Sequence, residues 1–287
     1  MTATAVTTEP MTQVAPPEHE HDAAPVGSTR RWMRDVWVLT RRNLLHIRRE
    51  PMQLSDVTIQ PVLFVFLFVY VFGAGVVIPN GSYADFAIAG LLALNLTTGT
   101  VGTAVGISGD IRTGVVDRFR TLPMSRSSVL VGRSISDLAA AVLATTLVCL
   151  TGLVVGWRPD DGLLSFLGGV GVVLLFAYAM AWGSACLGLV SQGPEAAQGI
   201  AFVLLFPLSF VSNAFVPTAG MPVVLEKIAD WNPVSAVTAS ARELFGNPNP
   251  SASVDAWPMQ HPTLAALGWS IVLLGIFVPL AVRYRLR

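Results

Sequence analysis

Six long stretches of this chain contain no aspartate, glutamate, lysine or arginine, and no other feature constrains the fold as strongly. They cover residues 57–84, 86–109, 138–157, 162–194, 196–225 and 256–282. A helix needs roughly 20 apolar residues to cross the hydrocarbon core of a bilayer, and each stretch is long enough. Charged residues make up only 13% of the chain, about half the share of a soluble domain. The sequence therefore predicts an all-α integral membrane protein with six transmembrane helices.

The predicted spans leave short links and two longer segments. We place the spans at about 57–78, 86–108, 135–157, 163–190, 197–216 and 264–282. Residues 1–29 are rich in Ala, Thr, Pro and Glu and lack apolar periodicity, which is typical of a disordered tail. The two cysteines, Cys149 and Cys186, lie inside spans and are expected to pack as small apolar side chains.

Arginines are concentrated in three places, and their distribution predicts the orientation. Residues 30–50 hold seven of the 18 Lys and Arg, residues 110–134 hold five, and the C-terminus holds three. Cytoplasmic segments carry an excess of such residues, so both termini and 110–134 are expected in the cytoplasm. The arginines of 30–50 cluster on one side of a helical wheel, which predicts an amphipathic helix lying in the membrane interface.

The basic segment between the second and third spans has its own helical pattern. Ile111, Val115 and Phe119 recur at four-residue intervals and would share one face of a helix. Pro123 would end that helix, since proline cannot continue one. The pattern predicts a short amphipathic helix held at the membrane surface. A solvated connecting loop is the alternative that the residues alone leave open.

Two spans carry features that could serve packing or a polar pathway. The middle of the second span, 95–103, is unusually polar, and Gly102 and Gly106 are spaced as in closely packed membrane helices. Pro207 is expected to kink the fifth span and free a carbonyl group. Helix packing and a pathway for cargo both remain open for these residues.

Several kinds of chemistry are disfavoured by what the sequence contains. The only lysine, Lys227, does not follow a GxxxxG frame, so the phosphate-binding loop of an ATPase is lacking. The four histidines do not cluster with other metal ligands, and we expect no metal site, no cofactor, no catalytic residues and no nucleic-acid partner. No ionisable residue lies deep in a span, which weakens a proton- or sodium-coupled carrier.

Three sets of residues resemble the permease subunits of type-2 ABC exporters, in particular the daunorubicin-resistance-like branch. The first is the segment from Asp110 to Arg133, with its Leu122-Pro123 pair. The second is Pro194-Glu195 leading to Phe206-Pro207 and Asn213. The third comprises Met221-Pro222, Asn232-Pro233 and Arg242. The resemblance covers residues 30–287.

The resemblance implies a division of labour between subunits. Two such permeases, expected as a homodimer, would assemble with two copies of a separate ABC ATPase in a bacterial plasma membrane. The 110–134 loop would carry the coupling helix, 30–50 would be the connecting helix, and 217–262 would be an extracellular re-entrant region. The residues implied at the ATPase interface are Asp110, Arg112, Gly114, Val115, Asp117, Arg118, Phe119, Arg120 and Pro123.

The function expected from these observations is ATP-driven export of an amphipathic drug, lipid or glycolipid by alternating access. The predicted substrate path is lined by Asn95, Thr97, Thr98, Phe206, Pro207, Phe210 and Asn213. A membrane-embedded enzyme acting on lipid-linked substrates, a secondary transporter and a structural scaffold are the alternatives. Copurification of an ATPase through 110–123 separates the exporter from the others.

Overall fold

The computed structural model describes residues 33–34, 37–38, 40–41, 51–76, 78, 81–114 and 126–284, and this part of the chain is helical and contains no β-strand. Its long helices are α2 (Pro51–Phe66) with the π-helical η1 (Leu67–Phe72), α3 (Tyr83–Gly99), α4 (Val101–Arg112), α6 (Arg126–Val154), α7 (Gly162–Val190), α8 (Pro194–Phe210) and α12 (Pro262–Tyr284). Most of the predicted tail and of the predicted 30–50 helix lies outside the described residues.

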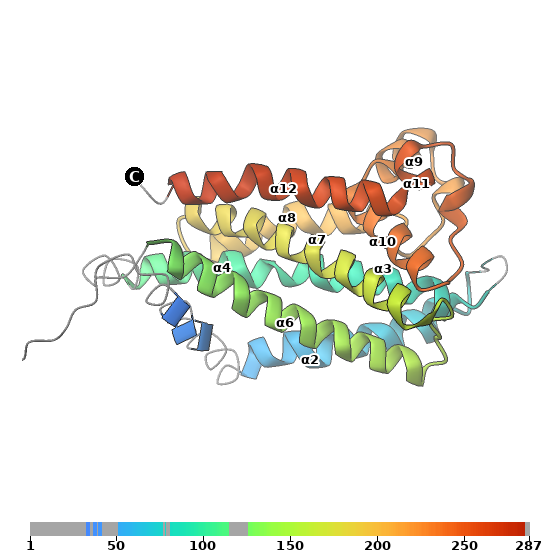
Figure 1. Cartoon of the computed structure of the whole chain (residues 1–287), viewed down its shortest axis with the longest axis horizontal. Coiled ribbons are helices and arrows are strands. Elements are labelled where there is room, and N and C mark those ends of the chain that lie inside the picture. The colour runs from blue at the N-terminus through green and yellow to red at the C-terminus, as the bar shows by residue number, and fades with distance from the viewer. Residues whose placement is uncertain are drawn as a thin grey trace, which may run out of the picture.

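The long helices run side by side along the longest axis of the molecule (Figure 1). α7 lies centrally and packs against α12, α4 and α6, while α4 also packs against α8. The short helices α9 (Val223–Asp230), α10 (Pro233–Leu244) and α11 (Trp257–Gln260) gather at the end of the bundle opposite the C-terminus. α10 packs against α12, α7 and α3, so the short helices cover this end of the bundle, which we call the capped end.

Helix length and composition support a multi-pass membrane protein. In the described part of the chain, four helical segments are long and apolar enough to cross a membrane, namely Tyr83–Arg112, Val131–Val154, Gly162–Val190 and Pro262–Arg283. Val57–Phe72 and Pro194–Phe210 are apolar but shorter. The apolar helical parts of the first and fifth predicted spans are therefore shorter than the sequence indicated, since η1 ends at Phe72 instead of near residue 78 and α8 ends at Phe210 instead of near Val216.

The second predicted span is a helix with an interruption at Thr100, between α3 and α4. The Thr100 hydroxyl donates to the carbonyl of Thr97 at 2.7 Å and accepts a hydrogen bond from Ser184 of α7 at 2.8 Å. Hydroxyl side chains that bond to nearby backbone carbonyls compete with the helical ladder and bend helices. The polar composition of 95–103 thus produces a local break that α7 holds in place.

At the capped end, α6 and α10 terminate in the same way. Gly156 after α6 and Gly246 after α10 have φ of 102° and 70°, which only glycine adopts readily. The residues that follow them, Trp157 and Asn247, bond back to carbonyls five residues earlier, so both helices end in a Schellman motif. The Trp157 indole N–H also donates to the Asn247 side chain at 2.7 Å, which joins the two ends.

Close packing of α4 on α7 depends on Gly188. A Cβ atom at this position would lie 2.5 Å from the backbone oxygen of Ala104, a contact that neither helix backbone can relieve without moving. By contrast, the Gly102 and Gly106 pair that predicted a close contact between helices does not provide it here. A Cβ at Gly102 would meet no atom within 4 Å, and Gly106 faces a side chain.

We expect Gly188→Ala to lower the free energy of unfolding of the bundle by about 1–3 kcal/mol, because it forces α4 away from α7. Gly171 lies in the same helix, is exposed and has open space beyond its Cα. Gly171→Ala should therefore leave stability unchanged or raise it by up to about 1 kcal/mol. Thermal unfolding of the purified variants in detergent measures both. Equal melting temperatures for Gly188→Ala and Gly171→Ala would contradict the close packing of α4 on α7.

Candidate functional site

The described residues include the start of the predicted ATPase interface but not its central part. Asp110 and Arg112 lie in the last turn of α4, and Gly114 follows the helix with φ of 68°. Ile111 and Arg112 are exposed. The remaining predicted interface residues lie outside the described residues, namely Val115, Asp117, Arg118, Phe119, Arg120 and Pro123.

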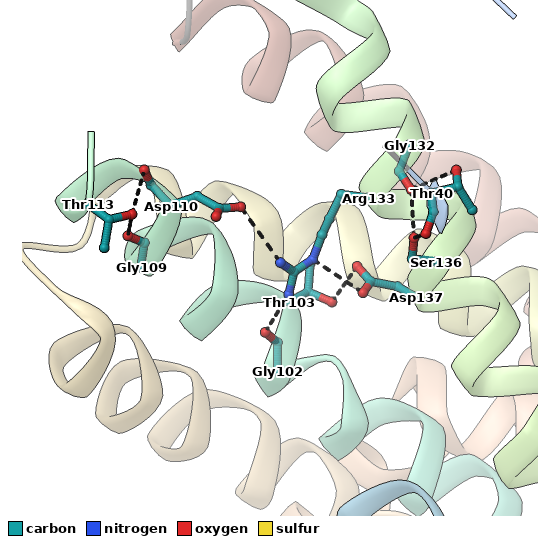
Figure 2. A network of polar contacts seen from close by, with 10 residues as sticks. All are labelled: Thr40, Gly102, Thr103, Gly109, Asp110, Thr113, Gly132, Arg133, Ser136 and Asp137. Carbon is teal, nitrogen blue, oxygen red and sulfur yellow. Dashed lines mark hydrogen bonds and ion pairs between the residues drawn. The ribbon is translucent and has the colours of Figure 1, made fainter. Parts of the chain in front are cut away.

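Directly behind this segment, a polar junction connects α4 to α6 (Figure 2). The guanidinium of Arg133 in α6 donates through Nη2 to the carbonyl of Gly102 at 3.1 Å. Its Nη1 lies 3.9 Å from Asp110 Oδ2, and its Nε lies 3.4 Å from Asp137 Oδ1. One side chain of α6 therefore binds two positions of α4 and a carboxylate of its own helix.

The α4 side of the junction is shaped to receive this side chain. A Cβ atom at Gly106 would overlap the Arg133 guanidinium, so only glycine leaves room for it. Thr103, one turn earlier, donates its hydroxyl to Asp137 Oδ2 at 2.8 Å. The Asp137 carboxylate thus accepts from both helices, and its side chain is 17% exposed against 21% for Arg133.

Thr40 brings the N-terminal segment to the same turn of α6. Its hydroxyl donates to the carbonyl of Gly132 at 3.2 Å, and its own carbonyl accepts from the Ser136 hydroxyl at 3.2 Å. Thr40 is buried, whereas Trp37, one turn earlier, is 66% exposed. The predicted connecting helix therefore contacts α6 next to the residues that bind α4 (Figure 2).

From the sequence alone, Arg133 is treated only as one of the basic residues of 110–134 and as the end of the family-like segment, and Asp137 is assigned no role. The signal available was local. Arg133 and Asp137 are four residues apart in a helix, a spacing that brings opposite charges together. Thr103 and Gly106 are three apart and share a helix face. What the sequence did not reveal is that these two faces meet.

In the second predicted span, the residues predicted to line the substrate path form side-chain hydrogen bonds within their own helix. The side chains of Asn95, Thr97 and Thr98 donate to the carbonyls of Leu91, Ala93 and Leu94 at 2.9, 2.7 and 2.8 Å. Thr97 is fully buried, while Asn95 and Thr98 are half-buried. In this conformation their polar atoms are satisfied within the helix.

The predicted path residues of α8 lie on an exposed aromatic face. Phe206 and Phe210 stack with ring centroids 4.2 Å apart, and Phe202 stacks on Phe206 at 4.9 Å. All three rings are exposed, as is Pro207. The sequence pointed to Phe206, Pro207 and Phe210 but missed Phe202, which extends the same face by one turn.

Asn213, by contrast, is fully buried beyond the end of α8. Its side-chain nitrogen donates to the Ser251 hydroxyl at 2.9 Å, and its backbone N–H donates to Ser235 at 3.0 Å. The structure therefore separates Asn213 from the aromatic face and makes it part of the contact between α8 and the cap.

A buried arginine organises this contact. Arg242 of α10 is 0% exposed and donates to the carbonyls of Phe86 at 2.9 Å, Asn213 at 3.0 Å and Ala214 at 2.9 Å. Its Cζ also lies 3.6 Å from the centre of the Phe86 ring, a cation–π contact. In the described part of the chain no carboxylate forms an ion pair with it. Burial lowers the pKa of Arg242 to about 9, so the side chain stays charged at neutral pH.

Asn232 completes the contact between α8 and α10. Its side-chain nitrogen donates to the carbonyls of Leu208 and Val211 at 2.7 and 2.5 Å, and its oxygen caps α10 by accepting from the Val234 N–H. Together Arg242 and Asn232 bind four carbonyl groups at the C-terminal end of α8 and just beyond it. These donors are the physical reason why α8 can stop at Phe210.

Comparison with known proteins agrees with the resemblance drawn from the sequence. The family model described as "ABC-2 type transporter" matches residues 34–245. The daunorubicin resistance ABC transporter permease protein DrrB1 of Streptomyces coeruleorubidus is 31% identical over 242 residues, which is 84% of this chain and 82% of that protein. The family resemblance predicted from the sequence is therefore confirmed.

More distant relatives cover as much of the chain. The probable doxorubicin resistance ABC transporter permease protein DrrC of Mycobacterium tuberculosis is 25% identical over 90% of this chain and 91% of its own length. The putative transport permease ycf38 of Porphyra purpurea is 23% identical over 86% of this chain and 84% of its own length. The family match over residues 34–245 spans the segments that contain the polar junction and Arg242.

We expect Arg242→Leu to destabilise the protein by about 3 kcal/mol or more, because three buried carbonyls lose their donor and each unsatisfied group costs about 1–3 kcal/mol. Arg158→Ala is the matched control, since Arg158 also donates to backbone carbonyls, those of Leu153 and Trp157, but is exposed. It should cost under about 1 kcal/mol. Thermal unfolding combined with limited proteolysis of 217–262 measures the effect. A melting temperature for Arg242→Leu equal to that of Arg158→Ala would refute the role of Arg242.

Proposed function

This chain belongs to the ABC-2 type transporter family, and we propose that it is the membrane-spanning permease subunit of an exporter whose ATP is hydrolysed by a separate subunit. The observation that carries the proposal is the likeness over most of the chain to proteins named as drug-resistance ABC transporter permeases. The sequence supports the division of labour, since its single lysine lies outside any phosphate-binding loop. We propose two permeases, as a homodimer, with two copies of the ATPase.

The proposed topology has six crossings of a bacterial plasma membrane. At 1.5 Å per residue, α2 together with η1 is long enough to cross, while α8 is shorter and is continued by the irregular segment 211–216. Irregular backbone at membrane depth is tolerated where it is buried in protein, and Arg242 and Asn232 supply that environment. On this topology the polar junction faces the cytoplasm and 217–262 forms the outer, re-entrant region.

The proposed docking site for the ATPase is the 110–134 loop. Its first residues emerge from α4 at the end of the bundle where the C-terminus also lies (Figure 1). A basic amphipathic helix there would present Phe119 to a groove on the ATPase, with Arg112 and Arg120 at the rim. Movement of this helix when the ATPase pair closes would drive alternating access.

The proposed path for the cargo runs along the exposed aromatic face of α8. Phe202, Phe206 and Phe210 offer flat apolar surfaces without fixed charge, which suits an amphipathic drug, lipid or glycolipid. Asn95 and Thr98 of α3 would contribute to that path only when α3 and α8 separate, because both now bond to their own helix.

The topology is tested by labelling single cysteines in a variant lacking Cys149 and Cys186. Ala252→Cys and Thr113→Cys place a thiol at exposed positions of the outer region and of the loop after α4. Ser82 is avoided because it caps α3. A membrane-impermeant maleimide applied to intact cells should label position 252 and not position 113, whereas both should react after permeabilisation. Labelling of position 113 from outside would reverse the proposed topology.

The division of labour is tested by coexpression with an ABC ATPase subunit from the same organism. Phe119→Ala should weaken capture of the ATPase by tenfold or more, since truncating a central aromatic anchor often costs about 2 kcal/mol. Arg112→Ala should weaken it less and with a stronger dependence on salt. Cargo efflux at matched expression should follow the same order. Wild-type capture and efflux by Phe119→Ala would mean that the loop is only a connector.

A further inference from the structure

The loop proposed to dock the ATPase begins at α4 and ends at α6, and these two helices belong to different parts of the bundle. α4 packs against α7 and α8, whereas α6 packs against α2, α3 and α7. A loop joined to both could transmit force only if its two ends keep a defined separation. The contacts between α4 and α6 near the loop therefore decide how stiff its base is.

We propose that Arg133 is a positioning residue that fixes the base of the coupling loop by holding α4 and α6 together. This inference rests on the proposed function, because it assigns the loop a role in docking the ATPase. Arg133 binds α4 at two points, the Gly102 carbonyl and Asp110, which are separated by two turns of the helix. The guanidinium therefore opposes both sliding and rotation of α4 relative to α6.

The geometry requires an arginine, and a positive charge alone does not suffice. The planar guanidinium directs Nη2, Nη1 and Nε to three acceptors at once, which the single ammonium group of lysine cannot do. Asp137 holds the guanidinium from the α6 side and accepts from Thr103 of α4, which gives a second link between the helices. Gly106 provides the space in which the guanidinium lies.

The junction also includes the N-terminal segment, which the arginine distribution predicts at the cytoplasmic surface. Thr40 is bound on both sides of the Arg133 turn, through Gly132 and Ser136. Two of the three arginine-rich segments, 30–50 and 110–134, therefore meet within one turn of α6. Figure 2 shows Arg133 between Asp110 on one side and Asp137 on the other.

Two variants remove the contacts of Arg133 with α4 by different means. Arg133→Ala deletes the guanidinium, and Gly106→Ala keeps it but fills the space that it occupies. Gly99→Ala is the matched control, since Gly99 lies two turns before Gly106 in the same predicted span, is exposed, and has no atom within 4 Å of the position of a Cβ. Arg133→Lys tests whether charge alone suffices and should behave like Arg133→Ala.

The first measurement is independent of the ATPase and of the cargo. Spin labels on Thr113→Cys and Ser127→Cys, in a background lacking Cys149 and Cys186, report the distance across the base of the loop in the purified full chain. We expect one narrow distance distribution in the wild type and in Gly99→Ala, and a broadened distribution in Arg133→Ala and Gly106→Ala. Narrow distributions in all variants would overturn the proposal.

The second measurement is capture of the ATPase by the same variants in vesicles of phosphatidylethanolamine and phosphatidylglycerol. A loop whose base is no longer fixed loses preorganisation, and we expect capture to weaken about tenfold at an unchanged melting temperature. If the melting temperature falls as far as in Gly188→Ala, Arg133 only stabilises the fold and the proposal is overturned. If the wild type captures no ATPase, the proposed function fails, while the distance measurement still decides whether Arg133 fixes the loop.

Discussion

Hydrocarbon supplies no hydrogen bonds, so a helix that stops at membrane depth must find donors for its free carbonyls within the protein. In the proposed topology this constraint explains the architecture of the capped end. α8 stops at Phe210, and the carbonyls of Leu208, Val211, Asn213 and Ala214 are bound by Asn232 and Arg242. Without α10 these groups would be unsatisfied, so the break in α8 and the cap that covers it form one structural unit.

The same constraint accounts for the polar residues in the second predicted span. Thr100 interrupts the helix, and its hydroxyl and that of Ser184 form a short chain of hydrogen bonds that ends on the Thr97 carbonyl. Burying hydroxyl groups is costly unless they are paired, and here each one named has a partner. Polarity in this span therefore accompanies the interruption at Thr100, and the hydrogen bond from Ser184 ties that point to α7.

Much of the fold could be predicted because the spans are set by composition alone. In the described part of the chain each long helix overlaps a charge-free stretch, and the Asp110–Arg133 segment indicated the family. Helix ends could not be predicted in the same way. The donors that allow α8 to end at Phe210 come from Asn232 and Arg242, and a count of apolar residues takes no account of side chains from a later part of the chain.

The candidate site was predicted less completely, for a related reason. Hydropathy and charge counts describe a residue's tendency to be inside or outside a membrane, not which neighbour it faces. The sequence put Arg133 in the basic segment 110–134, but its contact with Gly106 depends on the rotation of α6 about its axis. Likewise, Asn95 and Thr97 are polar as noted, yet each bonds to its own helix.

The two arginines at opposite ends of the bundle differ in a way that bears on transport. Arg242 is fully buried and binds only backbone carbonyls and a ring, so releasing it would expose a charge to an apolar interior at high cost. Arg133 is partly exposed and binds carboxylates at 3.4 and 3.9 Å, which water can replace at lower cost. In the proposed mechanism the capped end is therefore the fixed end of α8. At the loop end, the proposed contact through Arg133 would make α4 and α6 move as one unit relative to the other helices.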